Sequence, residues 1–563
     1  MTSRAGDSDD LTFDVVVLGS GAAGMTAAVS AHEAGATVAL FEKHEKLGGT
    51  SAWSGGQVWI PNNPHMAEVG VEDSRERAIE YIMSLSHGLI AQELAEAYVD
   101  AGPRMVELLE ARTPVEFYAV DGMPDYHPEF PGGNPGGGRT IECPIYAFED
   151  LGEWADRVTP SPYYPNPHIT MSETPLGRAV PTPPSADEIE ARRARNARGC
   201  GQALIGRLLR GLLDRGIEPF TSAPARQLIV EDGRVVGARI EIDGDLREVR
   251  ARRGVILACG GFEWNEDLKR AFLRGPMTHP VSIQTNEGDG LKMAMKAGAM
   301  LGNMREAWWV PVADVPVQEN AMERMMIAGQ RTLPRSIMVN GRGRRFTNEA
   351  ANYNAFGAAF HEQDVAGFRY ANLPSWLVFD QGYVDRFGFG RWAPPGSVPE
   401  WVTREPTLEA LAARLGMPEG ELTRTVERWN ELVSAGADTD FGRGESAFDR
   451  WWGDPNAKGQ KAATLGPLGE EPFYAVPVHS GALGTKGGPQ TDVNGQVLGI
   501  DGEPIGGLYA AGNVMASPFG MTYGGPGGTL GPAMVFGYLA GDHAAKAGHN
   551  ARNHQRERAE ASS

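Results

Sequence analysis

The fold of this chain is decided by the segment Asp14-Val15-Val16-Val17-Leu18-Gly19-Ser20-Gly21-Ala22-Ala23-Gly24. Its apolar, β-branched run predicts a short buried strand of a parallel sheet. The strand passes directly into Gly19-x-Gly21-x-x-Gly24, and a helical pattern then extends to about Ala34 and ends at Gly35. A strand, a glycine turn and a helix in this order predict a dinucleotide-binding unit.

Each glycine of the turn has its own role in holding a dinucleotide. Gly19 allows the tight turn, Gly21 lets the backbone approach a pyrophosphate, and Gly24 lets the helix pack closely on the strand. The N–H groups at the helix N-terminus then face the anion. A second predicted strand, residues 37–41, delivers Glu42, where a carboxylate can bind the ribose hydroxyls of an adenosine.

Bulk composition limits the classes of protein to which the chain can belong. Its 563 residues suffice for two or more domains, and 41% hydrophobic with 22% charged residues is typical of soluble globular proteins. A net charge of −20 argues against a nucleic-acid partner, because neutralising phosphates requires a basic surface. The three cysteines share no metal-ligand spacing, and His127, His361 and His479 stand isolated, so we expect no metal site.

The sequence also bears on location. The first ten residues are polar and acidic, unlike a signal peptide, and no apolar run approaches the roughly 18 residues of a membrane span. We therefore expect a cytoplasmic protein with no transmembrane segment and at most peripheral membrane contact.

We predict an α/β architecture in which the chain divides into three parts. Residues 1–284 form the first segment of a Rossmann-like nucleotide-binding domain, with a long Pro- and Gly-rich loop at 118–198. Residues 285–480 change in character, with Met-rich helical stretches and a strand-like run at 336–341, and are interpreted as an inserted domain. Residues 481–563 return to the first domain, because 508–513 again reads as a strand entering a glycine turn.

Further motifs follow the fingerprint along the chain. With Glu42, the segments Gly48-Gly49-Thr50-Ser51 and Ala510-Ala511-Gly512-Asn513 resemble the flavoprotein family that contains fumarate reductase and the 3-ketosteroid dehydrogenases. A larger set resembles the 3-ketosteroid Δ1-dehydrogenases of that family: Pro124-Asp125-Tyr126, Ala307-Trp308-Trp309, Phe346-Thr347-Asn348-Glu349 with Tyr353, Arg443-Gly444-Glu445-Ser446, Gly484-Thr485-Lys486-Gly487-Gly488, and Tyr523-Gly524-Gly525-Pro526-Gly527-Gly528-Thr529-Leu530-Gly531-Pro532-Ala533-Met534.

This resemblance implies a cofactor and the architecture that holds it. An early and a late segment would jointly bind non-covalent FAD, and an inserted α+β catalytic domain would cover the flavin. The cofactor-binding residues implied by the resemblance are Gly19, Ser20, Gly21, Ala22, Ala23, Gly24, Glu42, Lys43, Gly49, Thr50, Ser51, Gly56, Ala225, Gly260, Gly512, Asn513, Gly528 and Leu530. The other implied partners are a small-molecule cyclic ketone as substrate and an external electron acceptor.

The resemblance also implies the catalytic residues Tyr126, Tyr353, Tyr523 and Gly527. Making a double bond beside a ketone removes a weakly acidic α-proton and a β-hydride, so the carbonyl oxygen needs donors that strengthen as enolate charge develops. The resemblance assigns this role to the Tyr523 hydroxyl and the Gly527 N–H. It makes Tyr353 the base, supported by Tyr126, and flavin N5 the hydride acceptor. Without the resemblance, a purely structural role also explains two of these residues: Tyr126 as an aromatic side chain that packs in the interior, and Tyr353 as a side chain that covers the hydrophobic core.

The chain departs from the family pattern at three places. Gly524 follows the tyrosine where a proline is expected, which predicts a looser loop. The segment 142–198 and the Met-rich segment 322–326 match no family pattern, and both are candidates for a substrate entrance. Together with Trp308-Trp309 they would offer apolar, adaptable surface to a polycyclic ketone.

The predicted activity is FAD-dependent α,β-desaturation of a cyclic ketone, and specifically 1,2-dehydrogenation of a 3-ketosteroid. Desaturation of a smaller ketone such as cyclohexanone, or of a steroid at C4–C5, would use the same tyrosines. A fumarate-reductase-type reaction would need Arg and His groups to clamp a dicarboxylate. A non-catalytic flavin-binding protein would leave the tyrosines without a role.

Overall fold

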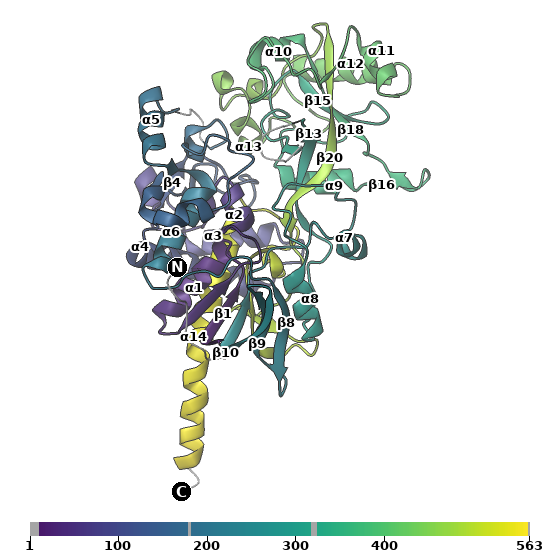
Figure 1. Cartoon of the computed structure of the whole chain (residues 1–563). Helices are drawn as coiled ribbons and strands as arrows, with labels where there is room; N and C mark the ends of the chain where they lie inside the picture. Colours follow the sequence, from purple (N-terminus) through teal and green to yellow (C-terminus); the bar gives the residue numbers. More distant parts are fainter. Residues whose placement is uncertain (1–10, 178–181, 317–323, 561–563) are drawn as a thin grey trace.

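The structure is a computed structural model, and it describes residues 11–177, 182–316 and 324–560. Two seven-stranded sheets organise the described residues (Figure 1), and smaller two- and three-stranded sheets lie beside them. The long strand β20 (Phe473–Thr485) runs from the upper sheet toward the lower one in Figure 1. No helix within the described ranges combines the length and apolar character that crossing a membrane requires.

The first sheet has the strand order β2-β1-β10-β23-β22. β1 (Leu11–Leu18) pairs in parallel with both β2 (Val38–Phe41) and β10 (Asp245–Leu257), and β10 pairs in parallel with β23 (Pro504–Ala510). β22 (Gln496–Leu498) is antiparallel at the edge. Neighbouring strands therefore come from both ends of the chain, which confirms the predicted Rossmann-like unit.

Helices α1 (Ala22–Glu33) and α14 (Leu530–Glu560) pack against each other beside this sheet (Figure 1). A Cβ atom on Gly537 would lie 2.4 Å from the Ala23 carbonyl oxygen, and one on Gly541 would lie 2.3 Å from the Ala27 carbonyl oxygen. Only glycine permits so close an approach, so the C-terminal helix completes the unit that begins at the N-terminus.

Segment 225–257 forms a run of hairpins. β8 (Ala225–Glu231) pairs antiparallel with β9 (Arg234–Ile242), which pairs antiparallel with the first half of β10. The second half of β10 turns into the parallel sheet and ends at the glycine turn that begins with Gly260.

The segment predicted as a long loop at 118–198 contains regular structure. β4 (Tyr118–Asp121), β5 (Gly137–Glu142) and β3 (Val58–Trp59) form a three-stranded sheet, and β6 (Tyr146–Ala147) pairs with β7 (Ala197–Arg198). α5 (Ala186–Ala194) has no buried residue, as expected for a solvated helix, while residues 178–181 lie outside the described part. Buried Arg139 holds the segment in place, with Nη1 donating to Asp125 and Nη2 to Asp73, each at 2.7 Å.

The second sheet has the order β14-β13-β20-β18-β15, and its pairings along this path are antiparallel. Its strands besides β20 are β11 (His279–Pro280), β13 (Ala307–Asp314), β14 (Arg324–Met326), β15 (Ser336–Asn340), β18 (Ser375–Asp380) and β19 (Thr403–Glu405). The Met-rich segment 322–326 is thus a strand where it is described, while Met322 lies outside the described residues. The boundaries at 284 and 480 stay a prediction.

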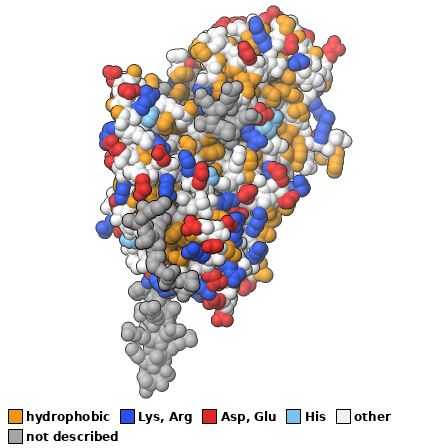
Figure 2. Space-filling model, viewed as in Figure 1, with side chains coloured by type: hydrophobic (Ala, Val, Ile, Leu, Met, Phe, Trp, Pro, Cys, Tyr) orange, Lys and Arg blue, Asp and Glu red, His pale blue; other side chains and the backbone are white. Residues whose placement is uncertain are grey.

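Further helices and short strands complete the described structure. They are α2 (Gly49–Trp53), α3 (Arg75–Ser84), α4 (Gln92–Arg112), α6 (Cys200–Leu213), α7 (Glu266–Phe272), α8 (Asp289–Lys296), β12 (Leu301–Gly302), α9 (Phe356–Phe360), β16 (Gln363–Asp364), β17 (Arg369–Tyr370), α10 (Gln381–Phe387), α11 (Leu408–Arg414), α12 (Glu421–Ser434), α13 (Ala447–Trp451) and β21 (Gly488–Pro489). On the face shown in Figure 2, acidic and basic side chains are interspersed, so no single-sign patch dominates that face.

A buried ion cluster stabilises the region around the second sheet. Glu349 accepts from Arg345 Nη2 at 2.7 Å and from Arg443 Nη1 at 3.2 Å, and Arg345 also pairs with Asp438 at 2.8 Å. The Glu349 and Arg443 side chains have no exposed surface. Burial raises the pKa of Glu349, but the two arginines more than offset this and hold it below its usual value.

We therefore predict that Glu349→Gln strongly destabilises the protein. The substitution leaves the buried guanidinium groups of Arg345 and Arg443 with a single carboxylate, that of Asp438. Removing one partner of a buried ion cluster costs about 3–5 kcal/mol. Thermal or denaturant unfolding measures the loss. The matched control is Glu419→Gln, an exposed glutamate whose replacement should change the free energy of unfolding by less than about 0.5 kcal/mol. Equal stability of the two variants would contradict the prediction.

Candidate active site

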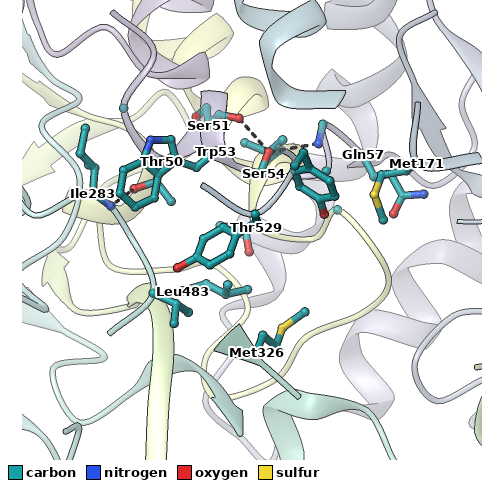
Figure 3. Close-up of a pocket in the computed structure, with 18 of the residues that line it drawn as sticks. Thr50, Ser51, Trp53, Ser54, Gln57, Met171, Ile283, Met326, Leu483 and Thr529 are labelled. Carbon is teal, nitrogen blue, oxygen red and sulfur yellow. Dashed lines mark hydrogen bonds between the residues drawn. The ribbon is translucent and has the colours of Figure 1, made fainter. Parts of the chain in front are cut away.

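A cavity of about 860 Å³ collects most of the residues singled out from the sequence. Its wall includes the glycine turns that follow β1, β10 and β23, and also residues of β14 and of the segment after α10. Figure 3 shows side chains from different parts of the chain, including Thr50, Thr529 and Met326, arranged around one space.

The turn after β1 has the geometry that its glycines predict. Gly19 has φ of 111°, and a Cβ there would lie 2.2 Å from the Ala258 carbonyl oxygen. A Cβ on Gly24 would lie 2.0 Å from the Gly19 carbonyl oxygen, so both positions require glycine. α1 starts after Gly21, whose missing side chain leaves room for a ligand, and it has no acidic residue in its first turn; the Ala22 N–H donates to the Ser51 hydroxyl at 3.1 Å. Its N-terminus therefore suits an anion such as a pyrophosphate.

Glu42 is held in one orientation at the end of β2. Its Oε2 accepts hydrogen bonds from the backbone N–H and the hydroxyl of Ser20, at 3.0 and 2.6 Å, and its Oε1 accepts from the His44 N–H at 2.9 Å. The carboxylate lines the cavity and retains acceptor positions for ribose hydroxyls. The neighbouring Lys43 pairs with Glu287 and Asp289, at 2.9 and 2.7 Å.

The late glycine turns close the same wall. Gly260 and Gly512 have φ of 73° and 75°, and a Cβ on Gly512 would lie 3.1 Å from the Cβ of Ala23. All of the predicted cofactor residues line the cavity except Gly24 and Gly528. Gly24 contributes to helix–strand packing, and a Cβ on Gly528 would meet the Tyr523 ring at 3.1 Å. The residues present thus fit an extended dinucleotide.

The three predicted tyrosines meet at one place in the cavity. The ring centroids of Tyr126, Tyr353 and Tyr523 lie 5.0 to 5.5 Å from one another, and each tyrosine is buried. The Tyr126 hydroxyl donates to the Tyr353 hydroxyl oxygen at 2.7 Å. The Thr529 hydroxyl donates to the Tyr523 oxygen at 2.9 Å, which leaves the Tyr523 proton free to face a ligand.

Gly527 adds a backbone donor to this cluster. Its φ is 92°, and a Cβ there would lie 2.6 Å from the Gln57 carbonyl oxygen. Its carbonyl accepts from the N–H groups of Trp59 and Gly531, at 3.2 and 2.9 Å. Among the described residues, its own N–H has no hydrogen-bond acceptor, although Gly527 lines the cavity. A ligand oxygen would satisfy this donor.

The loop at Gly524 is firmly held, in contrast to the expectation of a looser loop. The Gly524 carbonyl accepts from the Tyr126 N–H at 3.0 Å and from the Tyr81 hydroxyl at 2.6 Å. A Cβ at Gly524 would lie 2.8 Å from the Trp59 ring, so this indole fills the space that a larger residue would need. The Trp59 Nε1 donates to Asp125 at 2.8 Å, which links the loop to the residue beside Tyr126.

Burial sets the protonation of the cluster. It raises the pKa of Tyr126 and of Tyr353 well above the usual value for tyrosine, and it also raises the pKa of Tyr523. Arg331 acts against this effect, because its buried guanidinium favours the phenolate form of Tyr126. Arg331 is anchored by hydrogen bonds to the carbonyls of Ile327 and Ala351, at 3.0 and 2.7 Å. Sequence reasoning missed Arg331, since no motif marks it.

Other lining residues come from the segments that match no family pattern. Tyr163, Met171 and Leu176 belong to 142–198, and Met325 and Met326 belong to β14. By contrast, Trp308 and Trp309 are not among the cavity-lining residues. Trp308 packs edge-on against the Tyr523 ring, with centroids 4.8 Å apart, and Trp309 packs against His361. Trp308 therefore supports the Tyr523 ring, and neither indole forms a substrate platform in the cavity.

His479 is not isolated in the folded chain. Its ring stacks on His279 with centroids 4.0 Å apart, and the two histidines contact opposite oxygens of Asp314, at 3.3 and 3.0 Å. The three residues lie on β20, β11 and β13, which are neighbours only in the sheet. The expectation of an isolated His479 is therefore wrong, because strand pairing joins positions that are distant in sequence.

Comparisons with known proteins agree with this geometry. A family model described as FAD binding domain matches residues 14–530. The 3-oxosteroid 1-dehydrogenase of Mycobacterium tuberculosis is 41% identical over 565 residues, covering 95% of this chain and 98% of the relative. The 4-oxocyclohexanecarboxylate 2-dehydrogenase of Sinomonas cyclohexanicum is 40% identical over 538 residues, covering 94% and 92%.

A solved structure extends the agreement to the fold. The 3-ketosteroid Δ1-dehydrogenase of Sterolibacterium denitrificans, in complex with 1,4-androstadiene-3,17-dione, superimposes with a TM-score of 0.87 at 35% identity. The match covers 95% of this chain and 99% of that one. This chain therefore belongs to the family of FAD-binding flavoproteins that includes the 3-oxosteroid 1-dehydrogenases.

Proposed function

We propose that this chain is an FAD-dependent oxidoreductase that desaturates a cyclic ketone, introducing the C1–C2 double bond of a 3-ketosteroid. The observation that carries this proposal is the convergence of the hydroxyls of Tyr126, Tyr353 and Tyr523 and the Gly527 N–H in one cavity. The 3-oxosteroid 1-dehydrogenase relatives support the substrate class.

Tyr523 and Gly527 hold the ketone oxygen in this proposal. The Tyr523 hydroxyl has its oxygen occupied by Thr529 and its proton available, and the Gly527 N–H has no acceptor in the described part of the chain. Both donors sit in a site with apolar walls, where hydrogen bonds to a developing enolate oxygen are stronger than in water. They polarise the carbonyl and make the α-proton more acidic.

Tyr353 removes the α-proton. In this proposal the Tyr126 hydroxyl donates to the Tyr353 oxygen at 2.7 Å, a contact that would stabilise the phenolate once it forms. The buried Arg331 guanidinium favours negative charge on Tyr126. Because burial raises the pKa of Tyr353, the base is mostly protonated near neutrality, and the active fraction increases with pH.

Residues of both ends of the chain would hold the FAD, with its pyrophosphate at the N-terminus of α1 and its adenosine ribose at Glu42. When bound, the flavin supplies the acceptor for the hydride that leaves the β-carbon. We propose non-covalent binding, since His44, which follows the ribose acid Glu42 by two residues, does not line the cavity and accepts from the Lys46 N–H at 3.0 Å.

Two further features of the proposal concern the cellular setting. Because no side chain stores the electrons, an external acceptor must reoxidise the flavin. The cysteines Cys143, Cys200 and Cys259 are free thiols, which suits the reducing cytoplasm.

The second candidate is a dehydrogenase of a monocyclic ketone. It is favoured by the 40% identity to the 4-oxocyclohexanecarboxylate 2-dehydrogenase, and the same tyrosines would serve it. The unassigned apolar lining from 142–198 and β14 favours the larger ring system, because burying more apolar surface lowers the free energy of binding by about 25 cal/mol per Å² before ordering costs.

The test of the proposed function is anaerobic flavin reduction by a 4-ene-3-ketosteroid and by cyclohexanone. We expect kcat/KM for the steroid to exceed that for cyclohexanone by at least about 100-fold, since the difference in buried area amounts to several kcal/mol. Product analysis should show a new C1–C2 double bond. If cyclohexanone matches the steroid, the monocyclic candidate replaces the steroid, and if neither ketone bleaches the flavin, the reaction class itself is wrong.

Tyr523→Phe tests the carbonyl donor. The substitution keeps the ring that packs on Trp308 and removes only the hydroxyl, so we expect flavin reduction to slow by about 10²–10³-fold with FAD retained. Stopped-flow absorbance measures the rate, and the flavin-to-protein ratio measures retention. Tyr370→Phe, on β17 and not in the cavity lining, is the control and should leave the rate unchanged. A normal rate in Tyr523→Phe would mean that another group holds the ketone.

Tyr353→Phe tests the base through its pH dependence. In the unmodified enzyme, flavin reduction should accelerate as pH rises from about 7 to 9, because deprotonation of a tyrosine with a raised pKa produces the base. The variant should be slower by about 10²–10⁴-fold and should lose this acceleration, while ketone binding persists. An unchanged pH profile in the variant would exclude Tyr353 as the base.

A further inference from the structure

The charged residues that line the cavity form two groups. The first group is Glu42, the acid proposed to bind the adenosine ribose, together with Lys43 and Asp289, which form an ion pair at 2.7 Å. The only other charged lining residues in the described part of the chain are arginines: Arg324 on β14, Arg386 at the end of α10, and Arg391 just after it. This second group lies among elements of the second sheet and its cover, and no acidic lining residue accompanies it there.

Arg324 has no carboxylate within ion-pair distance among the described residues. Its Nη1 donates a long hydrogen bond, 3.4 Å, to the Pro280 carbonyl, and its guanidinium lies 5.5 Å from the centre of the Trp264 ring. The acid opposite Arg324 in the strand pair is Asp314, whose two carboxylate oxygens contact His279 and His479. Arg386 differs, because it pairs with the buried Asp454.

Tyr163 provides the second, independent observation. Its hydroxyl oxygen is buried and has no hydrogen-bond partner in the described structure, although the residue lines the cavity. Arg391 donates to the backbone carbonyls of Tyr163 and Pro162, at 3.0 and 3.3 Å, which brings its guanidinium to this segment. Tyr163, Arg324 and Arg391 line the same cavity, and the positive charges of the two arginines partly offset the rise that burial causes in the pKa of Tyr163.

We propose that Arg324, Arg391 and Tyr163 bind a carboxylate carried by the ketone substrate, so that the enzyme prefers a keto acid to the corresponding neutral ketone. This rests on the proposed function, because the same molecule must present its ketone to Tyr523. A guanidinium matches a carboxylate in shape and charge, and a buried hydroxyl without a partner is satisfied by the same group. Nearby apolar lining residues, among them Met325 and Trp392, exclude water and strengthen such contacts.

The alternative explanation is that these arginines are solvated side chains at the rim of the cavity, with no ligand. That explanation accounts for Arg391, which is exposed, but not for the buried hydroxyl of Tyr163. A solvated rim predicts no discrimination between an acid and its ester. An anion site predicts discrimination that disappears when its donors are removed.

The carboxylate can be carried by two kinds of ketone, and the experiment separates them. One pair of substrates is a 4-ene-3-ketosteroid with a carboxylic acid on its C17 side chain and the methyl ester of that acid. The other pair is 4-oxocyclohexanecarboxylate and its methyl ester. We expect the acid of one pair to exceed its ester by about tenfold in kcat/KM, through a lower KM at similar kcat, because the carboxylate lies away from the reacting carbons. The preference should shrink as the NaCl concentration rises.

Two variants of the holoenzyme test the assigned residues. Arg324→Gln should remove most of the acid preference by raising KM for the acid, and Tyr163→Phe should reduce it several-fold, with KM for the ester and kcat little changed. Arg270→Gln is the matched control, since Arg270 is exposed and pairs with Asp267 on α7. It should keep the full preference.

Acid and ester of each pair reacting equally well in the unmodified enzyme would overturn the proposal, as would a preference that survives in both variants. Isothermal titration calorimetry with the same acids and esters gives the binding preference without turnover. If no ketone is turned over but the acid binds about tenfold more tightly than its ester, and Arg324→Gln abolishes this difference, the proposed reaction fails while the anion site stands. If ketones are turned over without any acid preference, the anion site fails and the proposed reaction stands.

Discussion

The backbones of helices α1 and α14 are in direct contact. Because of this contact, residues from both ends of the chain line one cavity. Glycines at 537 and 541 let α14 approach the Ala23 and Ala27 carbonyls to a distance that no side chain would permit. Since α14 begins at Leu530, directly after the Tyr523–Thr529 loop, this crossing brings the candidate ketone donors to the glycine turn of β1. A chain break or a bulky residue at the crossing would separate the nucleotide site from the candidate reaction site.

Each of the two tyrosines that share a hydrogen bond lies close in sequence to a buried ion network. Tyr126 comes directly after Asp125, which is fixed by Arg139 and Trp59. Tyr353 lies four residues after Glu349, which is fixed by Arg345 and Arg443. Such networks are weak evidence for stability in themselves, because desolvating the charges offsets much of the attraction. Their value here is geometric, since each network restrains one half of a pair whose oxygens lie 2.7 Å apart.

The site combines apolar walls with a few charged groups, and this balance governs its chemistry. Burial raises the pKa of the tyrosines and would disfavour a phenolate base, and the contact with Tyr126 adds to the rise at Tyr353. Arg331 and the hydrogen bond with Tyr353 act in the opposite direction on the pKa of Tyr126. The same low polarity makes each unsatisfied donor costly. The Gly527 N–H and the Tyr163 hydroxyl have no partner within the described ranges, which is why both point to ligand atoms.

The sequence by itself determined the parts of this protein that depend on local chemistry. The β1 strand, the glycine turn, α1 and the placement of Glu42 follow from short-range pattern and from the φ values that only glycine adopts readily, as at Gly19. The roles expected of Tyr523 and Gly527 came from resemblance to a family, not from periodicity. Only the tertiary structure decided which distant residues meet. Tyr126 and Tyr353 are 227 positions apart, Trp308 turns its ring to Tyr523 and not to the cavity, and the Trp59 ring packs against Gly524. Likewise, no sequence motif marks Arg331, or the group of Arg324, Arg391 and Tyr163. Long-range packing brings these residues to the cavity, and local periodicity carries no information about long-range packing.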